Sequence, residues 1–374
     1  MNSTLKLLDL GQSIWYDNIQ RNLLKNGEFS GMITRREIRG VTSNPSIFMN
    51  AITKSSDYDA SLAPLAKSGL SAEEIFYQLA IEDIQEAADF FSTLYKQTNG
   101  GDGYVSLEVN PYFANDTENT LAEAKLLWKR VARPNLMIKI PATKAGIPAI
   151  TEAIASGINV NVTLIFSLER YGEVMEAYIK GLEKRVNAGL PVQAIASVAS
   201  FFVSRVDSNI DLRLKKLVEN GMISAEKANT LAGKAAIANA RLAYTDYLKV
   251  FQSERFLKLK VEGAQEQRPL WASTSTKNPA YRDVMYVEEL VGANTVNTVP
   301  PQTLVAFLDH GQVRTSIAEN LPDAEKLFQD LQAIGIAMKD VTAILEDEGV
   351  KSFADAFTVL IKAVEEKRQT VVLG

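Results

Sequence analysis

Short apolar segments alternate with helical patterns along most of this chain, and that alternation restricts the folds open to it. About eight segments are rich in β-branched and apolar residues and are bounded by turn signals. They lie at 13–17, 41–46, 104–109, 136–140, 158–166, 193–198, 269–273 and 295–299. Strands separated by crossover helices predict an α/β fold of the (β/α)₈ TIM-type barrel with extra helices, although a doubly wound open sheet would leave a similar pattern.

The last part of the chain has a different pattern. From about residue 311 onward it is helical only, with Pro322, Gly335 and Gly349 as punctuation. We therefore expect the segment 311–374 to be a helical tail that packs on the barrel instead of forming a second core. A barrel with insertions and such a tail fills 374 residues, so we expect a single domain over 1–374.

Composition excludes several classes of function. The chain has no cysteine and one histidine, His310, so disulfides, thiolate chemistry and histidine-based zinc sites or triads are not expected, and no metal site is predicted. The net charge of −5 offers no broad basic field for nucleic acid or anionic lipid. Neither a signal peptide pattern nor a long apolar run is present, which predicts a cytoplasmic protein without a membrane segment.

One lysine stands inside a predicted buried strand. Lys139 lies within the apolar run 136–140, which Pro141 closes. An ammonium group buried without a partner costs several kcal/mol, and the neutral amine that relieves this cost attacks carbonyls. Lys139 is therefore a candidate Schiff-base nucleophile. The alternatives are a lysine whose head reaches water, or one paired to a carboxylate for structural reasons.

Other polar residues are expected at or just beyond the carboxyl ends of the predicted strands, where barrel enzymes place their functional groups. They are Asp17, Asn44, Glu108, Asn161, Thr163 and Ser200. Taken singly, each could cap the following helix, and Glu108 with Lys139 could be a structural ion pair. Together with Lys139 they suit amine catalysis on a sugar. The lysine forms an iminium with a ketose, carboxylates move protons, and amides and hydroxyls hold the substrate, without a metal or other cofactor.

Five motifs taken together resemble the transaldolases, in the longer form that carries an extended helical tail. They are Thr-Ser-Asn-Pro-Ser at 42–46, Leu-Glu-Val at 107–109, Met-Ile-Lys-Ile-Pro-Ala at 137–142, Asn-Val-Asn-Val-Thr-Leu-Ile-Phe-Ser at 159–167, and Ser-Phe-Phe-Val-Ser-Arg at 200–205. The match extends over roughly residues 13–304. By resemblance the fold is a barrel with the Schiff-base lysine on its fourth strand.

The resemblance implies a role for each matching residue. Lys139 is the Schiff-base nucleophile, and Asp17 deprotonates the C4 hydroxyl of the donor. Glu108 and Thr163 position the water that moves protons while the imine forms and hydrolyses. The substrate is expected to contact Asn44, Asn161, Ser200, Phe202 and Arg205, with Phe202 shaping the pocket and Arg205 binding phosphate.

Two departures from the family pattern concern the substrate end. Better-known members carry a second arginine shortly after a serine beyond the seventh strand, whereas this chain reads Ser273-Thr-Ser-Thr-Lys277. We expect Ser273 and Lys277 to bind substrate there, with Lys277 as a point charge. Ser43 stands where threonine is commoner, and His310 has no family role.

The predicted activity is transfer of a dihydroxyacetone unit between sugar phosphates. The donor is sedoheptulose 7-phosphate or fructose 6-phosphate and the acceptor glyceraldehyde 3-phosphate or erythrose 4-phosphate, in the non-oxidative pentose phosphate pathway. The alternatives are an aldolase that releases free dihydroxyacetone, and an inactive sugar-phosphate-binding protein. Glu108 and Phe202 favour transfer, because related small aldolases carry glutamine and tyrosine there. A monomer or homodimer is expected.

Overall fold

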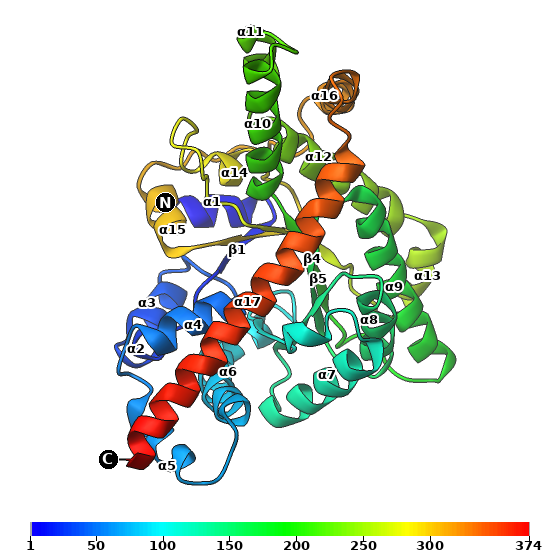
Figure 1. The fold of residues 1–374 in the computed structure, drawn as a ribbon. Coiled ribbons are helices and arrows are strands. Elements are labelled where there is room, and N and C mark those ends of the chain that lie inside the picture. The colour runs from blue at the N-terminus through cyan, green and yellow to red at the C-terminus, as the bar shows by residue number, and fades with distance from the viewer. Residues whose placement is uncertain (1, 374) are drawn as a thin grey trace.

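The computed structural model describes residues 2–373 and has a curled, all-parallel sheet at its centre (Figure 1). The strands are β1 (Gln12–Tyr16), β2 (Val105–Glu108), β3 (Leu136–Pro141), β4 (Val160–Ile165), β5 (Ser197–Phe202), β6 (Arg268–Ala272) and β7 (Thr295–Val299). Their order in the sheet is β1-β7-β6-β5-β4-β3-β2. The expected α/β architecture is therefore present, as a curled parallel sheet of seven strands surrounded by helices.

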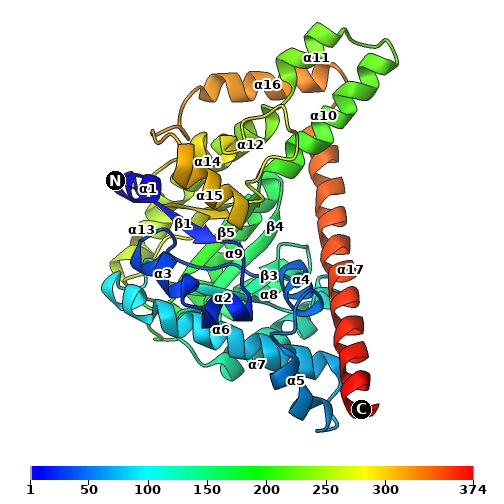
Figure 2. The same cartoon turned by 90° about the vertical axis from the view of Figure 1, so that its left-hand side faces the viewer.

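Helices surround the sheet and connect its strands (Figures 1 and 2). They are α1 (Ser3–Asp9), α2 (Arg21–Lys25), α3 (Glu28–Thr34), α4 (Pro45–Thr53), α5 (Asp59–Ala66), α6 (Ala72–Gln97), the 3₁₀ turn η1 (Pro111–Phe113), α7 (Thr117–Val131), α8 (Gly146–Ala155), α9 (Leu168–Asn187), α10 (Ser204–Glu219), α11 (Ala225–Leu231), α12 (Ala235–Phe251), α13 (Glu254–Val261), α14 (Met285–Glu288), α15 (Pro301–His310), α16 (Leu321–Ala333) and α17 (Met338–Leu373). Within the described residues no helix is long and apolar enough to cross a membrane.

The prediction of a second strand over residues 41–46 is wrong in its length. Only Val41 makes parallel bridges, one to Tyr16 of β1 and one to Val105 of β2. Helix α4 starts at Pro45, whose fixed φ suits the first helical turn, and the Asn44 side chain caps it by accepting from the Ile47 amide at 3.0 Å. Because Asn44 is the N-cap of α4, the chain stops running alongside the strands soon after Val41.

Three other boundaries also differ from the prediction. The strand expected at 193–198 is β5, Ser197–Phe202, because residues 192–196 form a turn closed by the Ile195 amide on the Val192 carbonyl. The sequence pattern near residues 35–38 also predicts a helix, whereas α3 ends at Thr34 and is followed by Arg36 at a φ of 60°. The sequence pattern at 283–291 predicts a helix as well, but only the short helix α14 forms there.

The strands are buried along nearly their whole length, as expected for a parallel sheet that is covered on one face and filled on the other. Trp15 of β1 and Trp271 of β6 are among the largest fully buried side chains. The apolar core is continuous from the strands to the tail, since Phe353, Phe357 and Leu360 of α17 belong to the same cluster.

Helix α17 runs across the molecule past the carboxyl ends of the strands. Figures 1 and 2 show it as one long rod along one side, in contact with α4, α6, α10 and β4. Gly349 was expected to interrupt the tail, but the helix continues through it. A Cβ atom at Gly349 would lie 3.0 Å from Leu164 Cδ2, so glycine permits a close approach of α17 to β4.

Candidate active site

A cavity of about 200 Å³ opens at the carboxyl ends of the strands. Most residues singled out in the sequence line it: Asp17, Asn44, Lys139, Thr163, Ser200, Phe202, Arg205, Ser273 and Lys277. Glu108 and Asn161 lie directly behind this wall, in contact with lining residues. The topology thus brings together side chains that are more than 250 residues apart in the chain.

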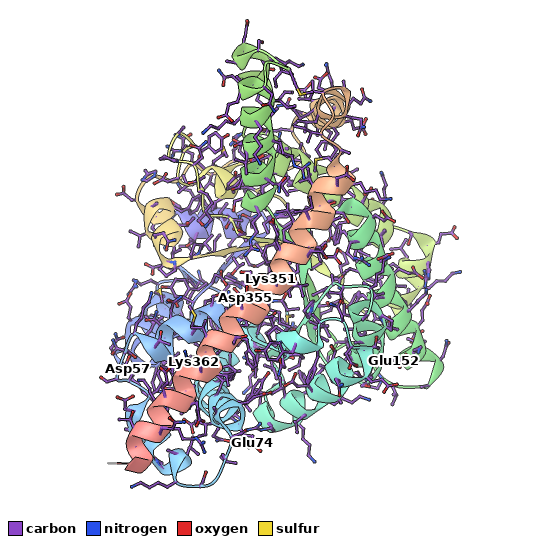
Figure 3. All side chains as sticks on the ribbon, viewed as in Figure 1. Asp57, Glu74, Glu152, Lys351, Asp355 and Lys362 are labelled. Carbon is purple, nitrogen blue, oxygen red and sulfur yellow. The ribbon has the colours of Figure 1, made fainter. Side chains whose placement is uncertain are left out.

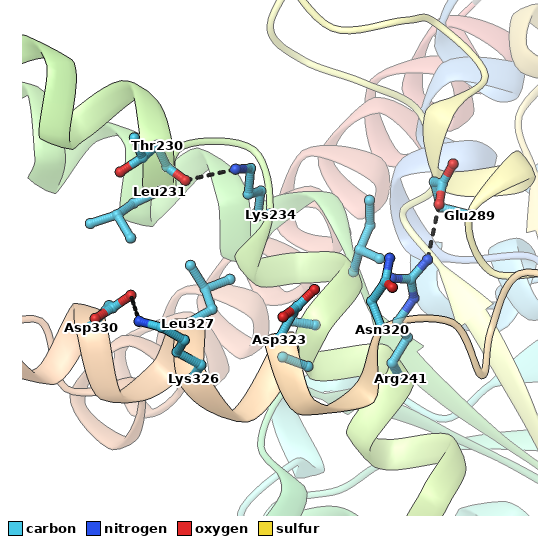
Figure 4. Close-up of a pocket in the computed structure, with 13 residues that line it drawn as sticks. Thr230, Leu231, Lys234, Arg241, Glu289, Asn320, Asp323, Lys326, Leu327 and Asp330 are labelled. Atoms are coloured by element: carbon cyan, nitrogen blue, oxygen red, sulfur yellow. Dashed lines mark hydrogen bonds and ion pairs between the residues drawn. The ribbon is translucent and has the colours of Figure 1, made fainter.

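A larger cavity, of about 420 Å³, lies between α12 and α16 (Figure 4). Four of its charged groups form two ion pairs: Arg241 Nη2 is 2.9 Å from Glu289 Oε2, and Lys326 Nζ is 2.9 Å from Asp330 Oδ2. None of the residues predicted for the site lines it. Side-chain chemistry, and not volume, therefore identifies the cavity at the strand ends as the candidate active site.

Lys139 is held in place by the register of the sheet. Glu108 of β2, Lys139 of β3 and Asn161 of β4 are partners in successive parallel pairs, so their side chains point to the same side of the sheet. Lys139 is 5 % exposed, and its Nζ donates to the Ser43 carbonyl at 3.1 Å. The same Nζ lies 3.4 Å from Glu108 Oε2. The lysine amine is thus buried, oriented and close to one carboxylate.

Glu108 is a buried carboxyl group with an unusual titration. Burial raises the pKa of Glu108 to about 7, against the opposing attraction of the Lys139 ammonium, and nearby Asp17 adds to the increase. Among the described residues, its carboxylate oxygens have no hydrogen-bond partner, and neither does Thr163 Oγ1. Two buried polar groups beside the lysine therefore have unused hydrogen-bonding capacity.

Asp17 follows the last residue of β1, as expected. Its Oδ1 accepts a 2.7 Å hydrogen bond from Thr42 Oγ1, which is itself 2.7 Å from Thr298 Oγ1. Burial raises the pKa of Asp17, and the charge of Lys139 opposes that rise. Thr42 also lines the cavity but received no role from the sequence, although it opens the motif at 42–46.

Asn161 lies deeper than expected. It is the second residue of β4, not a residue at the carboxyl end, so it sits behind the cavity wall. Its Oδ1 accepts from Ser200 Oγ at 2.7 Å and its Nδ2 donates to Ser106 Oγ at 3.0 Å. Ser200 is inside β5, not beyond it, and does line the cavity. Asn161 therefore orients Ser200, and Ser106 orients Asn161.

Two cations, Arg205 and Lys277, line the cavity. Arg205 stands at the start of α10, its guanidinium carbon 5.5 Å from the centre of the Phe202 ring. Lys277 Nζ donates to Ser275 Oγ at 2.7 Å. Burial lowers the pKa of both groups, and the charge of Arg205 further lowers that of Lys277. Neither Arg205 nor Lys277 is in an ion pair with any described residue. The part of the cavity that they line therefore favours an anion.

Further lining residues were not identified in the sequence. Ser275 lies in the segment 273–277, in which only Ser273 and Lys277 were predicted to bind substrate. Its position two residues before Lys277 could have indicated that it belongs to the site. Gln302 lies three residues beyond the last predicted strand, and this position was the available signal. Phe353 belongs to α17 and carries no such signal. His310 is outside the cavity, with Nε2 2.9 Å from Asp283 Oδ1. In the described part of the chain, no three acidic or histidine side chains are placed to share a metal ion.

Glu108 should make the free energy of unfolding depend on pH. In the folded protein this carboxyl group keeps its proton up to about pH 7, whereas in an unfolded chain it loses the proton near pH 4.5. The folded state therefore binds more protons between these values, and this group lowers stability as the pH rises through that window. The shift corresponds to about 3 kcal/mol at most.

We expect Glu108→Gln to remove this contribution. Urea unfolding at pH 5 and pH 8 should show that the wild type loses about 2 kcal/mol more than the variant between the two pH values. The exposed Glu152 provides the matched control, because Glu152→Gln should keep the wild-type pH dependence. An unchanged slope in Glu108→Gln would show that Glu108 is ionised well below pH 7 in the folded protein.

The comparisons with known proteins agree with this geometry. The family model described as "Transaldolase/Fructose-6-phosphate aldolase" matches residues 14–364. A transaldolase of Trichodesmium erythraeum is 48% identical over 98% of this chain and 97% of its own. A transaldolase of Saccharopolyspora erythraea is 50% identical over 98% of both chains. One of Thermobifida fusca is 49% identical over 98% of this chain and 99% of its own. Identity at this level over almost the full length of each chain, together with the family match, means that the chain belongs to the transaldolase/fructose-6-phosphate aldolase family and is an enzyme of the transaldolase type.

Proposed function

We propose that the protein transfers a dihydroxyacetone unit from fructose 6-phosphate or sedoheptulose 7-phosphate to glyceraldehyde 3-phosphate or erythrose 4-phosphate, in the non-oxidative pentose phosphate pathway. One observation carries this proposal. A buried lysine amine shares a cavity with two cations that have no acidic partner among the described residues. An amine suits a ketose carbonyl, and the cations suit a phosphate.

Lys139 is the nucleophile in this proposal. Once the Lys139 ammonium has lost a proton, the amine adds to C2 of the ketose, and loss of water from the carbinolamine gives the iminium. Glu108, with its pKa of about 7, supplies and takes back protons through a water held between its carboxylate and Thr163 Oγ1. The unused hydrogen-bonding capacity of these two groups supports this assignment.

Asp17 breaks the carbon–carbon bond. Its carboxylate takes the proton of the C4 hydroxyl, the C3–C4 bond cleaves, and the bonding electrons move into the iminium to give an enamine of dihydroxyacetone. The aldose product leaves, and the enamine carbon then adds to the aldehyde of the acceptor while the Asp17 carboxyl group returns its proton to the oxygen of that aldehyde. Hydrolysis of the new iminium returns the free amine of Lys139. Thr42, which donates to Asp17 Oδ1, keeps the carboxylate oriented.

The remaining residues bind the sugar. Asn44 and Ser200 hold hydroxyl groups, Asn161 acts through Ser200, and Phe202 forms an apolar wall. Arg205, Lys277 and Ser273 bind the phosphate. Lys277 takes the place of the second arginine of better-known members as a point charge without bidentate geometry.

The same family includes fructose 6-phosphate aldolases, which makes release of free dihydroxyacetone the second candidate activity. Transfer is favoured by Glu108 and Phe202, at positions where related small aldolases carry glutamine and tyrosine. An inactive binding protein is disfavoured because Asp17, Glu108 and Lys139 are all present and grouped around one cavity.

We also propose that Val41 closes the sheet into a full barrel, since it bridges both outer strands. The continuous apolar core supports a single domain over 1–374, with 311–374 as a tail packed on the barrel. A cytoplasmic enzyme that is a monomer or homodimer remains the prediction from the sequence.

A trapping experiment tests the proposed function. The enzyme is incubated with fructose 6-phosphate and borohydride, and the modified peptide is mapped by mass spectrometry. A reduced three-carbon adduct on Lys139 is expected, and added erythrose 4-phosphate should yield sedoheptulose 7-phosphate without borohydride. Folded protein that forms no adduct on any lysine would instead be a binding protein.

Arg205→Ala should mainly weaken the binding of phosphorylated donors. Loss of charge-assisted hydrogen bonds to a remote phosphate should raise the KM for fructose 6-phosphate by about 10- to 100-fold and change kcat much less. Initial rates with fructose 6-phosphate and with unphosphorylated fructose separate the two effects, because fructose should be almost unaffected. Arg213→Ala, on the same helix but outside the cavity, is the control. An unchanged KM in Arg205→Ala would remove Arg205 from the phosphate site.

A further inference from the structure

Helix α17 has two different faces. Lys351, Asp355 and Lys362 are exposed, and in Figure 3 they lie along the outer side of the helix. Phe353, Phe357, Leu360 and Val364 are buried and recur at the spacing of one helical face. The helix therefore has a defined inner side, and Phe353 belongs to it.

Contacts before and after Phe353 in the sequence fix the orientation of this inner side. One turn further on, Phe357 packs edge-on against Phe76 and Tyr112, with ring centres 5.7 and 5.5 Å apart. Towards the carboxyl end, Lys367 Nζ is 2.7 Å from Asp59 Oδ1 and donates to the Ser55 carbonyl. One turn before Phe353, Gly349 packs closely on Leu164. The Phe353 ring is thus held by packing at neighbouring turns.

Phe353 is the residue of α17 that reaches the active-site cavity. It is 5 % exposed and lines the cavity, and its ring centre lies 5.4 Å from Lys139 Nζ. The other lining residues come from the strands of the sheet and the segments that follow them. An apolar ring from the tail therefore faces the amine that would carry the substrate.

We propose that Phe353 determines the balance between transfer and release by keeping bulk water away from the bound enamine. This inference rests on the proposed function. Release of free dihydroxyacetone requires two steps after C3–C4 cleavage. A proton is added to the enamine carbon to give an iminium, and water then adds to the iminium carbon, the C–N bond breaks, and the lysine amine and the ketone are regenerated.

Exclusion of bulk water by Phe353 slows the first of these steps. The enamine carbon then keeps its electron pair until an acceptor aldehyde arrives. The water held by Glu108 and Thr163 remains available for hydrolysis of the product iminium. Phe353 thereby favours transfer without taking part in a proton step.

The test compares two rates from the same donor. Fructose 6-phosphate is supplied with and without erythrose 4-phosphate, and free dihydroxyacetone and sedoheptulose 7-phosphate are both measured. Phe353→Ala should raise the ratio of release to transfer by about 10-fold, because the apolar wall is lost. Phe353→Leu restores apolar volume but not the aromatic face, so recovery of the wild-type ratio assigns the effect to water exclusion. A ratio that stays high in Phe353→Leu would overturn water exclusion as the cause.

Leu360→Ala is the matched control. It truncates a fully buried side chain of the same helix that does not line the cavity, so it loosens the packing without opening the wall. Its ratio should remain that of the wild type. If Phe353→Ala lowers both rates equally, or if Leu360→Ala changes the ratio as much, Phe353 has only a packing role. A wild type that releases dihydroxyacetone but transfers nothing would overturn the proposed function itself.

Discussion

Lys139→Ala should lose transaldolase activity by about 10,000-fold or more, because the variant has no amine to form the covalent intermediate. The same variant should give no reduced adduct when it is treated with fructose 6-phosphate and borohydride. The measurement combines the rate of transfer to erythrose 4-phosphate with peptide mapping of the trapped protein. Retained turnover in this variant would refute the Schiff-base mechanism.

The fold should survive this change. The Lys139 amine contacts the Ser43 carbonyl and Glu108, and its removal leaves a buried carboxyl group without a counter-charge. With its pKa already near 7, Glu108 can take up a proton instead of remaining charged, which limits the cost to a few kcal/mol. Circular dichroism and urea unfolding check this point. Lys139→Met is a second variant that keeps the volume of the lysine stem.

Lys144→Ala is the matched lysine control. Lys144 is exposed, follows the same strand, and does not line the active-site cavity. It should retain both activity and the trapped adduct. Loss of the adduct in both lysine variants would mean that the reaction with borohydride does not report on a single oriented amine.

The sequence predicts the parts of the fold that depend on local pattern. The strands around Glu108 and Lys139 lie where their β-branched and apolar composition indicates, because a buried parallel strand has few alternatives for such residues. The strand at 41–46 fails because Pro45 and Asn44 favour the start of a helix over further sheet pairing. The strand at 197–202 was placed too early because its start depends on a turn closed by backbone hydrogen bonds, which apolar pattern does not reveal.

Some residues of the candidate site could likewise be predicted from local sequence pattern, and others could not. Asp17, Glu108 and Lys139 could be found because polar residues at strand ends stand out from an apolar pattern. The depth of Asn161 could not, because it depends on the stagger of β4 relative to its neighbours. Phe353 could not be found either, since an aromatic residue at helical spacing reads as core and only tertiary packing brings it to the lysine.

Asp17→Asn should stop the reaction after the Schiff base has formed. The amide cannot take the proton of the C4 hydroxyl, so C3–C4 cleavage should fall by about 1,000-fold. The amide oxygen still accepts from Thr42 Oγ1, so the local geometry should be preserved. Borohydride should therefore trap the intact six-carbon sugar phosphate on Lys139, whereas the wild type gives the three-carbon adduct. The measurement is the mass of the modified peptide together with the rate of aldose release.

Glu108→Gln distinguishes the C3–C4 cleavage step, which we assign to Asp17, from the proton transfers during imine formation, which we assign to Glu108. If Glu108 acts while the imine forms, its variant should accumulate little adduct of either size, whereas Asp17→Asn should accumulate the six-carbon adduct readily. Both carboxyl groups interact electrostatically with the Lys139 amine, and the pKa of each is raised by burial, so a simple loss of activity would not distinguish them. A three-carbon adduct that forms at the wild-type rate in Asp17→Asn would assign the cleavage step to a different base.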